Sequence, residues 1–135
     1  MAKLTGLSAT LAVDDSGGMA RTVSNDILSI SVSTPKGLQD VSGMNVSAME
    51  RLVLRTDGKM DYAYVFNDTS STGSFAVFST ASSTGVTRTH TYTVQTKVLA
   101  MEMLIPDFPL ALGADGALTG SISAVLNSTT VPTWA

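Results

Sequence analysis

The chain has 135 residues, 14% of them charged, and a formal net charge of −3. This length predicts a single domain, 1–135, that buries roughly 68–70% of the surface of its unfolded chain. The absence of cysteine excludes disulfides, thiolate nucleophiles and cysteine-ligated metals, and the negative charge argues against a protein that grips nucleic acid.

Serine and threonine fill many of the polar positions that charged residues usually take. Such a surface suits contacts with other protein chains better than it suits keeping a monomer apart, which favours an assembly subunit. The N-terminal residues lack the apolar region of a signal peptide, and no apolar run reaches membrane-spanning length. We therefore expect assembly in a cytoplasm and no membrane insertion.

The first third of the chain alternates apolar and polar residues, which predicts β-strands with one buried face. Leu7 and Leu11 share the buried side of the first strand, and Leu28, Ile30 and Val32 alternate with serines in the clearest one. The expected strands lie at 7–13, 26–34 and 38–42, separated by turns at 14–18 and 35–37.

The segment 41–55 loses this alternation and admits two interpretations. Ser47 and Glu50 match a capping box, the pattern that begins many helices. We favour an extended, mobile loop that ends in a strand near Arg51 and reaches a hairpin turn at Asp57–Gly58, and we leave a partly helical form before assembly open. Apolar residues in an exposed loop usually have a partner, and methionine adapts to imperfect surfaces. The apolar residues concerned are Met44, Val46, Met49 and Leu52.

A strand and then a short helix are expected next. Met60, Tyr62, Tyr64 and Phe66 share one face of the strand. After a polar stretch, apolar residues at helical spacing predict a helix over 73–81, capped by a preceding serine or threonine and ended by a Ser-Ser-Thr-Gly sequence.

The stretch 87–126 is the expected core sheet. Threonine takes every other position from Thr87, an apolar run follows, and the Asp115–Gly116 pair predicts a hairpin before the last strand. On that last strand the buried face consists of Leu118, Ile122, Ala124 and Leu126. The chain closes with a loop that carries one aromatic residue, Trp134. Together these elements predict a mainly β fold: an antiparallel β-sandwich or open barrel with one short flanking α-helix and a long extended loop.

No motif points to catalysis. His90 is the only histidine and no motif pairs it with a nucleophile, while Asp107 and Asp115 lie too near turns for a carboxylate pair. The segment 113–116 lacks the lysine and the following helix of a phosphate-binding loop. We therefore expect that the protein is not an enzyme and uses neither a cofactor nor a metal.

Several short motifs occur in a characteristic order from Asp26 to the end of the chain. They are Asp26–Ser29, Leu38–Gly43, Ser47–Arg51, Asp57–Gly58, Val65–Asp68, Asp107–Phe108, Gly113–Leu118 and Val131–Trp134. In this order and spacing they resemble the tail tube (major tail) proteins of long-tailed, non-contractile bacteriophages. The serine-rich stretch 69–73 departs from the shorter, alanine-rich form of that family's helix.

The resemblance implies a β-sandwich-like subunit with six copies in a ring, and rings stacked into a hollow tube whose bore conducts double-stranded DNA during ejection. The implied partners are further copies of the chain, a tape-measure protein, and tail terminator and distal tail proteins. The implied location is the tail of a virion assembled in the bacterial host cytoplasm. A tailocin and a gene-transfer particle stay open as alternatives to a phage tail, because they are built on the same subunit. The family's loop between rings falls on Val41, Met44, Val46, Met49, Arg51, Leu52 and Arg55.

A bore for DNA should not hold phosphates, because contacts that neutralise phosphates bring affinity through counterion release. A ring of six copies would carry 6 × −3 = −18 charges. The candidate luminal acids are Asp14, Asp15, Asp61 and Asp107, each of which could equally be a solvated turn or outer-face residue.

The alternative function is a β-sandwich binding module, such as a capsid decoration or carbohydrate-binding protein. Sugar-binding sandwiches commonly stack exposed aromatic rings on the sugar, and this chain has one tryptophan, near its C-terminus. A hydrolase would need a pocket that the sequence does not show.

Overall fold

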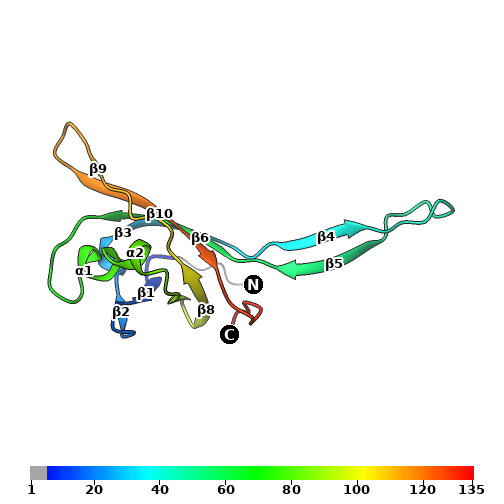
Figure 1. Cartoon of the computed structure of the whole chain (residues 1–135), viewed down its shortest axis with the longest axis horizontal. Helices are drawn as coiled ribbons and strands as arrows, with labels where there is room; N and C mark the ends of the chain where they lie inside the picture. Colours follow the sequence, from blue (N-terminus) through cyan, green and yellow to red (C-terminus); the bar gives the residue numbers. More distant parts are fainter. Residues whose placement is uncertain (1–5) are drawn as a thin grey trace.

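A computed structural model describes residues 6–135 of the chain (Figure 1). The strands are β1 (Thr10–Asp14), β2 (Ala20–Thr22), β3 (Ile27–Ser33), β4 (Lys36–Asp40), β5 (Arg51–Thr56), β6 (Lys59–Val65), β7 (Arg88–Val94), β8 (Lys97–Leu104), β9 (Ala111–Leu112) and β10 (Leu118–Leu126). The helices are η1 (Ser24–Asp26), a 3₁₀ turn, α1 (Ser74–Phe78) and α2 (Ala81–Thr84). The mainly β architecture expected from the sequence is confirmed.

Antiparallel pairing joins the main sheet in the order β2-β1-β7-β8-β10-β6-β3, with β9 added to β10. The predicted core stretch forms the middle of this sheet, where His90 lies opposite Met101 and Leu126 opposite Met103. The sheet curls so that β1 and β3, which are not paired, line one cavity of about 390 Å³. The result is an open barrel with its core on the inside.

One face of the sheet carries the core. On β6 the side chains of Met60, Tyr62 and Tyr64 are buried, as the alternation in the sequence predicts. Leu99 from β8 joins them, and α1 covers this face so that the ring of Phe78 lies 5.8 Å from that of Tyr62. α1 therefore covers part of the core through its contacts with β6.

The predicted helix over 73–81 is present as two shorter pieces. Gly73 precedes α1 and no side-chain cap is made, so the prediction of a serine or threonine cap is wrong. The backbone N–H of Ser74 donates instead to the buried carboxylate of Asp26, at 3.1 Å. α2 continues to Thr84, and Gly85, with φ of +64°, ends it in the left-handed conformation.

Two predicted strand faces also need correction. β1 begins only at Thr10, and Leu7 is 94% exposed. In β3 a bulge between Ile27 and Ser29 adds one residue to the strand and reverses the direction of the side chains before it. Ile27 therefore packs against the core, while Leu28, predicted to be buried, is exposed.

The hairpin predicted at Asp57–Gly58 is wrong. β5 pairs with β4 and β6 pairs with β3, so the strands on either side of this dipeptide do not pair with each other. The backbone N–H of Asp57 donates to the carbonyl of Pro35 at 2.8 Å, which carries the antiparallel ladder through this point. Gly58 serves close packing here, because a Cβ at this position would lie 2.9 Å from the sulfur of Met101.

Candidate assembly surface

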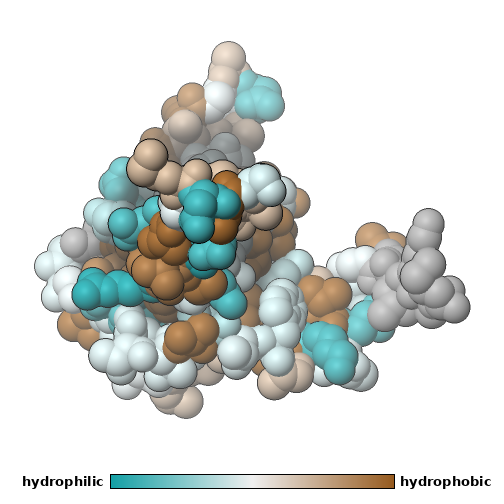
Figure 2. Space-filling view, turned by 90° about the vertical axis from the view of Figure 1, so that its right-hand side faces the viewer, coloured by the Kyte–Doolittle hydropathy of each residue, from teal (hydrophilic) through white to brown (hydrophobic). Residues whose placement is uncertain are grey.

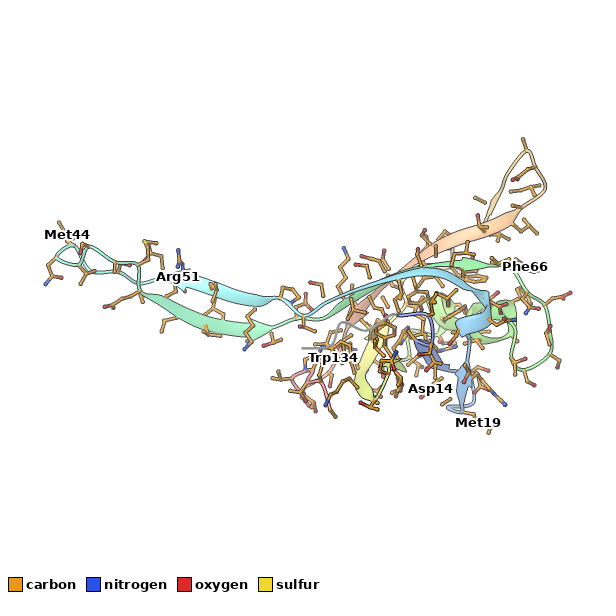
Figure 3. All side chains as sticks on the ribbon, turned by 180° about the vertical axis from the view of Figure 1, so that it is seen from behind. Asp14, Met19, Met44, Arg51, Phe66 and Trp134 are labelled. Carbon is orange, nitrogen blue, oxygen red and sulfur yellow. The ribbon has the colours of Figure 1, made fainter. Side chains whose placement is uncertain are left out.

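Residues 36–56 extend away from the body as a two-stranded structure, here called the ribbon (Figure 1). The ribbon extends the strand pair β3–β6 beyond the main sheet. β10 pairs with β6, and its last hydrogen bond to this chain segment is from the N–H of Leu126 to the carbonyl of Gly58, at 2.9 Å. Past that point β4 and β5 pair only with each other. Met44 lies at the far end of the ribbon (Figure 3).

Both faces of the ribbon expose apolar side chains. Leu38 and Val53 are directly opposite on one face and are 58% and 64% exposed. Leu52 and Leu54 share the other face and are 53% and 49% exposed. A two-stranded hairpin is at best marginally stable in water, and this one has no core on either side. These four side chains therefore stay exposed on both faces of the isolated chain.

Two arginines flank this apolar surface. Arg51 lies on the same face as Val53, whereas the bulge in β5 puts Arg55 off that face. Within residues 6–135 neither arginine forms an ion pair. Asp40 lies directly opposite Arg51, but its carboxylate accepts hydrogen bonds from the N–H and hydroxyl of Ser42, at 2.9 and 2.7 Å. These hydrogen bonds hold the pKa of the Asp40 carboxyl below its ordinary value. The arginines remain available to a partner.

The tip of the ribbon, residues 41–50, is closed by hydrogen bonds rather than by a helix. The N–H of Glu50 donates to the hydroxyl of Ser42 at 2.7 Å, and the N–H of Val41 donates to the carbonyl of Glu50 at 2.9 Å. The helical alternative based on Ser47 is therefore not adopted, since no helix occurs between β4 and β5. The apolar side chains exposed beyond this closure are Met44, Val46 and Met49.

All the residues predicted for the inter-ring loop lie on the ribbon, those from Arg51 onward within β5. Seen end on, the ribbon presents brown apolar and teal polar side chains side by side (Figure 2). Sequence reasoning missed Leu38, Val53 and Leu54, although the consecutive apolar residues at 52–54 were a signal, because a strand with one buried face would alternate there.

A second projection is formed by the hairpin of β9 and β10. Leu112 pairs with Leu118, and Gly116, with φ of +89°, makes the turn predicted there. Leu110 and Leu112 are 46% and 71% exposed. This hairpin leaves the body at the end opposite the ribbon (Figure 1).

The four candidate luminal acids come from three separate places. Asp14 ends β1 and Asp15 lies in the following turn, where its carboxylate is 2.9 Å from Arg21 and this hydrogen bond lowers its pKa. Asp61 lies on the outer face of β6, with its carboxylate 3.5 Å from the ammonium of Lys59. Asp107 is exposed in the connection from β8 to β9. Their assignment to a bore stays a prediction.

The buried polar groups of the core make structural contacts. His90 is fully buried, with Nε2 3.0 Å from the hydroxyl of Tyr62 and Nδ1 3.0 Å from the carbonyl of Arg88. Burial lowers the pKa of His90 to about 4. The buried guanidinium of Arg88 donates to the carbonyls of Asp14 and Val77 and to the hydroxyl of Thr80, which ties α1 and α2 to β1.

Neither a metal centre nor a membrane helix is found in residues 6–135. No group of three or more histidine or acidic residues is placed to hold a metal ion there. In the same range no helix has the length and apolar character needed to cross a membrane.

No protein-family model and no curated protein matches the sequence. Among solved structures, a chain from the tail of an empty gene transfer agent particle with C6 symmetry matches with a TM-score of 0.76 and 13% identity, over 98% of this chain and 99% of that one. A chain of the virion of a native gene transfer agent particle matches with a TM-score of 0.72 and 12% identity, over 93% and 95%. A chain of the six-fold symmetrised baseplate of the anti-feeding prophage matches with a TM-score of 0.68 and 7% identity, over 100% and 97%.

These likenesses show the fold: it is that of chains from gene transfer agent particles and from the anti-feeding prophage baseplate, matched over 93–100% of this chain. The resemblance to tail tube proteins drawn from the sequence is confirmed at the level of the fold.

Proposed function

We propose that the protein is a structural subunit of a phage tail tube that self-assembles into stacked hexameric rings. The observation that carries the proposal is the ribbon, which exposes Leu38 and Val53 on one face and Leu52 and Leu54 on the other. In a monomer these apolar side chains stay in water and contribute no hydrophobic free energy. A subunit that buries them against the next copy gains the free energy of removing them from water.

The structural neighbours support the ring. Two of them come from particles described with C6 or six-fold symmetry, and each matches this chain over nearly all of its length. Heterologous contacts that close around an axis make rings, and those that repeat along an axis make filaments. A subunit with apolar projections at two opposite ends has surfaces for contacts that repeat along an axis.

The finer features of the proposal rest on the sequence resemblance and on charge. In it the bore conducts double-stranded DNA, the tape-measure, tail terminator and distal tail proteins are partners, and the subunit resides in the virion after assembly in the host cytoplasm. The chain is acidic overall, which suits a channel that must release its cargo. The non-contractile type of tail is a prediction from the resemblance, because the fold is shared by chains from more than one kind of particle.

The proposal is tested with the purified protein. Negative-stain electron microscopy at increasing concentration should show rings or tubes with a central hole. A protein that stays strictly monomeric at high concentration contradicts the proposal. Binding of the monomer to phage capsids in co-sedimentation, or to glycans, would instead favour the decoration or carbohydrate-binding alternative.

A ribbon-less variant sharpens the test. Residues 37–55 are replaced by Asn-Gly, because Lys36 and Thr56 are already directly opposite and a two-residue turn can join them. The core is untouched, so the variant should fold with a melting temperature close to that of the original and should not form tubes. Tubes of normal length from this variant would remove the ribbon from the assembly mechanism.

A further inference from the structure

The chain contains two Asp-Gly dipeptides, Asp57–Gly58 and Asp115–Gly116. At such a pair the backbone nitrogen of the glycine can attack the side-chain carboxyl carbon of the aspartate, because glycine has no side chain that shields its nitrogen. The attack also requires the backbone around the pair to turn, so it is favoured where the chain opens locally at little cost in free energy. The structure places the two pairs in opposite surroundings.

Asp115–Gly116 lies in the turn of the β9–β10 hairpin, which projects from the body (Figure 1). Residues 110–117 are all exposed, and a Cβ on Gly116 would meet no atom within 4 Å. The hairpin is short, since β9 has only two residues and pairs only with Leu118 and Thr119. This turn can therefore open without disturbing the core.

The carboxylate of Asp115 lies close to the peptide that would attack it. Its Oδ1 accepts a hydrogen bond from the N–H of Ala117 at 3.1 Å, which folds the side chain back across Gly116. Within residues 6–135 no ion pair holds this carboxylate elsewhere. The N–H of Gly116 donates to the carbonyl of Gly113 at 3.0 Å. That hydrogen bond must open for the attack, and it lies in an exposed turn.

Asp57–Gly58 shows that proximity and freedom are separate conditions. The nitrogen of Gly58 lies only 2.8 Å from Oδ1 of Asp57. The N–H of Asp57, however, donates to the carbonyl of Pro35 at 2.8 Å, and the carbonyl of Gly58 accepts from Leu126 at 2.9 Å. A Cβ on Gly58 would lie 2.9 Å from the sulfur of Met101. Ring closure here would have to break these contacts, so the fold protects this pair.

We propose that Asp115 is a site of isoaspartate formation. The nitrogen of Gly116 bonds to Cγ of Asp115, and the hydroxyl of the carboxyl group leaves with the proton of the nitrogen as water. The product is a five-membered succinimide ring. A water molecule then opens the ring at one of its two carbonyl carbons. Opening at Cγ restores aspartate, whereas opening at the main-chain carbonyl carbon leaves the chain running through Cβ and Cγ as isoaspartate.

Isoaspartate keeps the negative charge of Asp115 and adds one methylene to the main chain of the turn. The register of a hairpin depends on the length of its turn, so the added atom should disturb the pairing of Leu112 with Leu118. We expect the short strand β9 to loosen and the exposed segment 110–112 to become more mobile. This inference does not depend on the proposed function, because it concerns the subunit alone.

Ageing of the purified protein tests the site. The folded protein is kept at neutral pH and physiological temperature for several weeks, digested, and mapped by fragmentation mass spectrometry that distinguishes isoaspartate from aspartate. We expect isoaspartate at residue 115 and none at residue 57. A sample unfolded in guanidinium chloride is the control, and it should gain isoaspartate at both residues because the protection of Asp57 is lost. The variant Asp115→Ser should show no isoaspartate in the folded state.

Two results overturn the proposal. One is the absence of isoaspartate at residue 115 of the folded protein. The other is its formation at residue 57 at least as fast as at residue 115, which would show that proximity decides and that the freedom of the turn does not. Hydrogen exchange compares aged with fresh protein, and faster exchange in residues 110–112 of the aged sample supports the loosening of β9. Unchanged exchange in a sample that carries the modification overturns that consequence.

Discussion

Replacing Leu52 and Leu54 by serine should abolish stacking without unfolding the subunit. Both side chains lie on one face of the ribbon, 53% and 49% exposed in the isolated chain. Full burial of a leucine is worth about 1.5–3 kcal/mol, so burying the exposed half of each contributes about 1 kcal/mol per side chain. With two leucines per subunit and six subunits per ring in the proposed assembly, the loss is about 12 kcal/mol for each pair of stacked rings.

The assay is the fraction of protein that pellets as tubes, together with the melting temperature of the subunit. The double variant should remain in the supernatant and should melt close to the original temperature, since neither leucine contacts the core. Val86→Ser is the control, because Val86 is 61% exposed in the connection between α2 and β7, away from the ribbon. Tubes formed by the double variant at the original concentration would show that the ribbon face is not buried between rings. A large drop in melting temperature would show that the leucines stabilise the subunit itself.

Three further predictions concern the subunit. The folded-state pKa of His90 is about 4 and its ordinary value is 6.5, so its contribution to the free energy of unfolding should be full above pH 6.5 and fall by about 3 kcal/mol as the pH drops to 4. Urea unfolding at each pH measures this, and His90→Gln should remove this pH dependence of the free energy of unfolding. Gly120→Ala should cost about 1–3 kcal/mol in urea unfolding because its Cβ would collide with the Pro109 carbonyl, whereas Gly6→Ala, with nothing within 4 Å, should be neutral; equal stabilities would contradict the crossing of β10. Arg88→Met should destabilise by about 2–4 kcal/mol, since it leaves buried carbonyls without a donor, and hydrogen exchange should show the loss first in α1 and α2; uniform exchange would refute the tie between helices and sheet.

The pattern of side chains along the chain was enough to predict the strands whose two faces differ in polarity. In β6 and β10 every second residue is apolar, and the alternation gave both the secondary structure and the buried face correctly. The exposed segment 41–55 was also predictable. Apolar residues without strand or helix periodicity indicate a surface that the chain does not bury by itself. The segment that carries the candidate functional surface could therefore be predicted from the local sequence.

Long-range pairing decided the rest. Asp57–Gly58 has the composition of a hairpin turn, yet β5 pairs with β4, so the dipeptide lies within a continuous ladder. Leu28 follows the alternation of β3, yet a bulge against β6 turns it outward. The groove of about 380 Å³ that is lined by Leu28 and Leu110 could not be predicted at all, because these residues meet only across the sheet. In each case the deciding contact is with a residue distant in the chain, and such contacts leave no periodic trace in the local sequence.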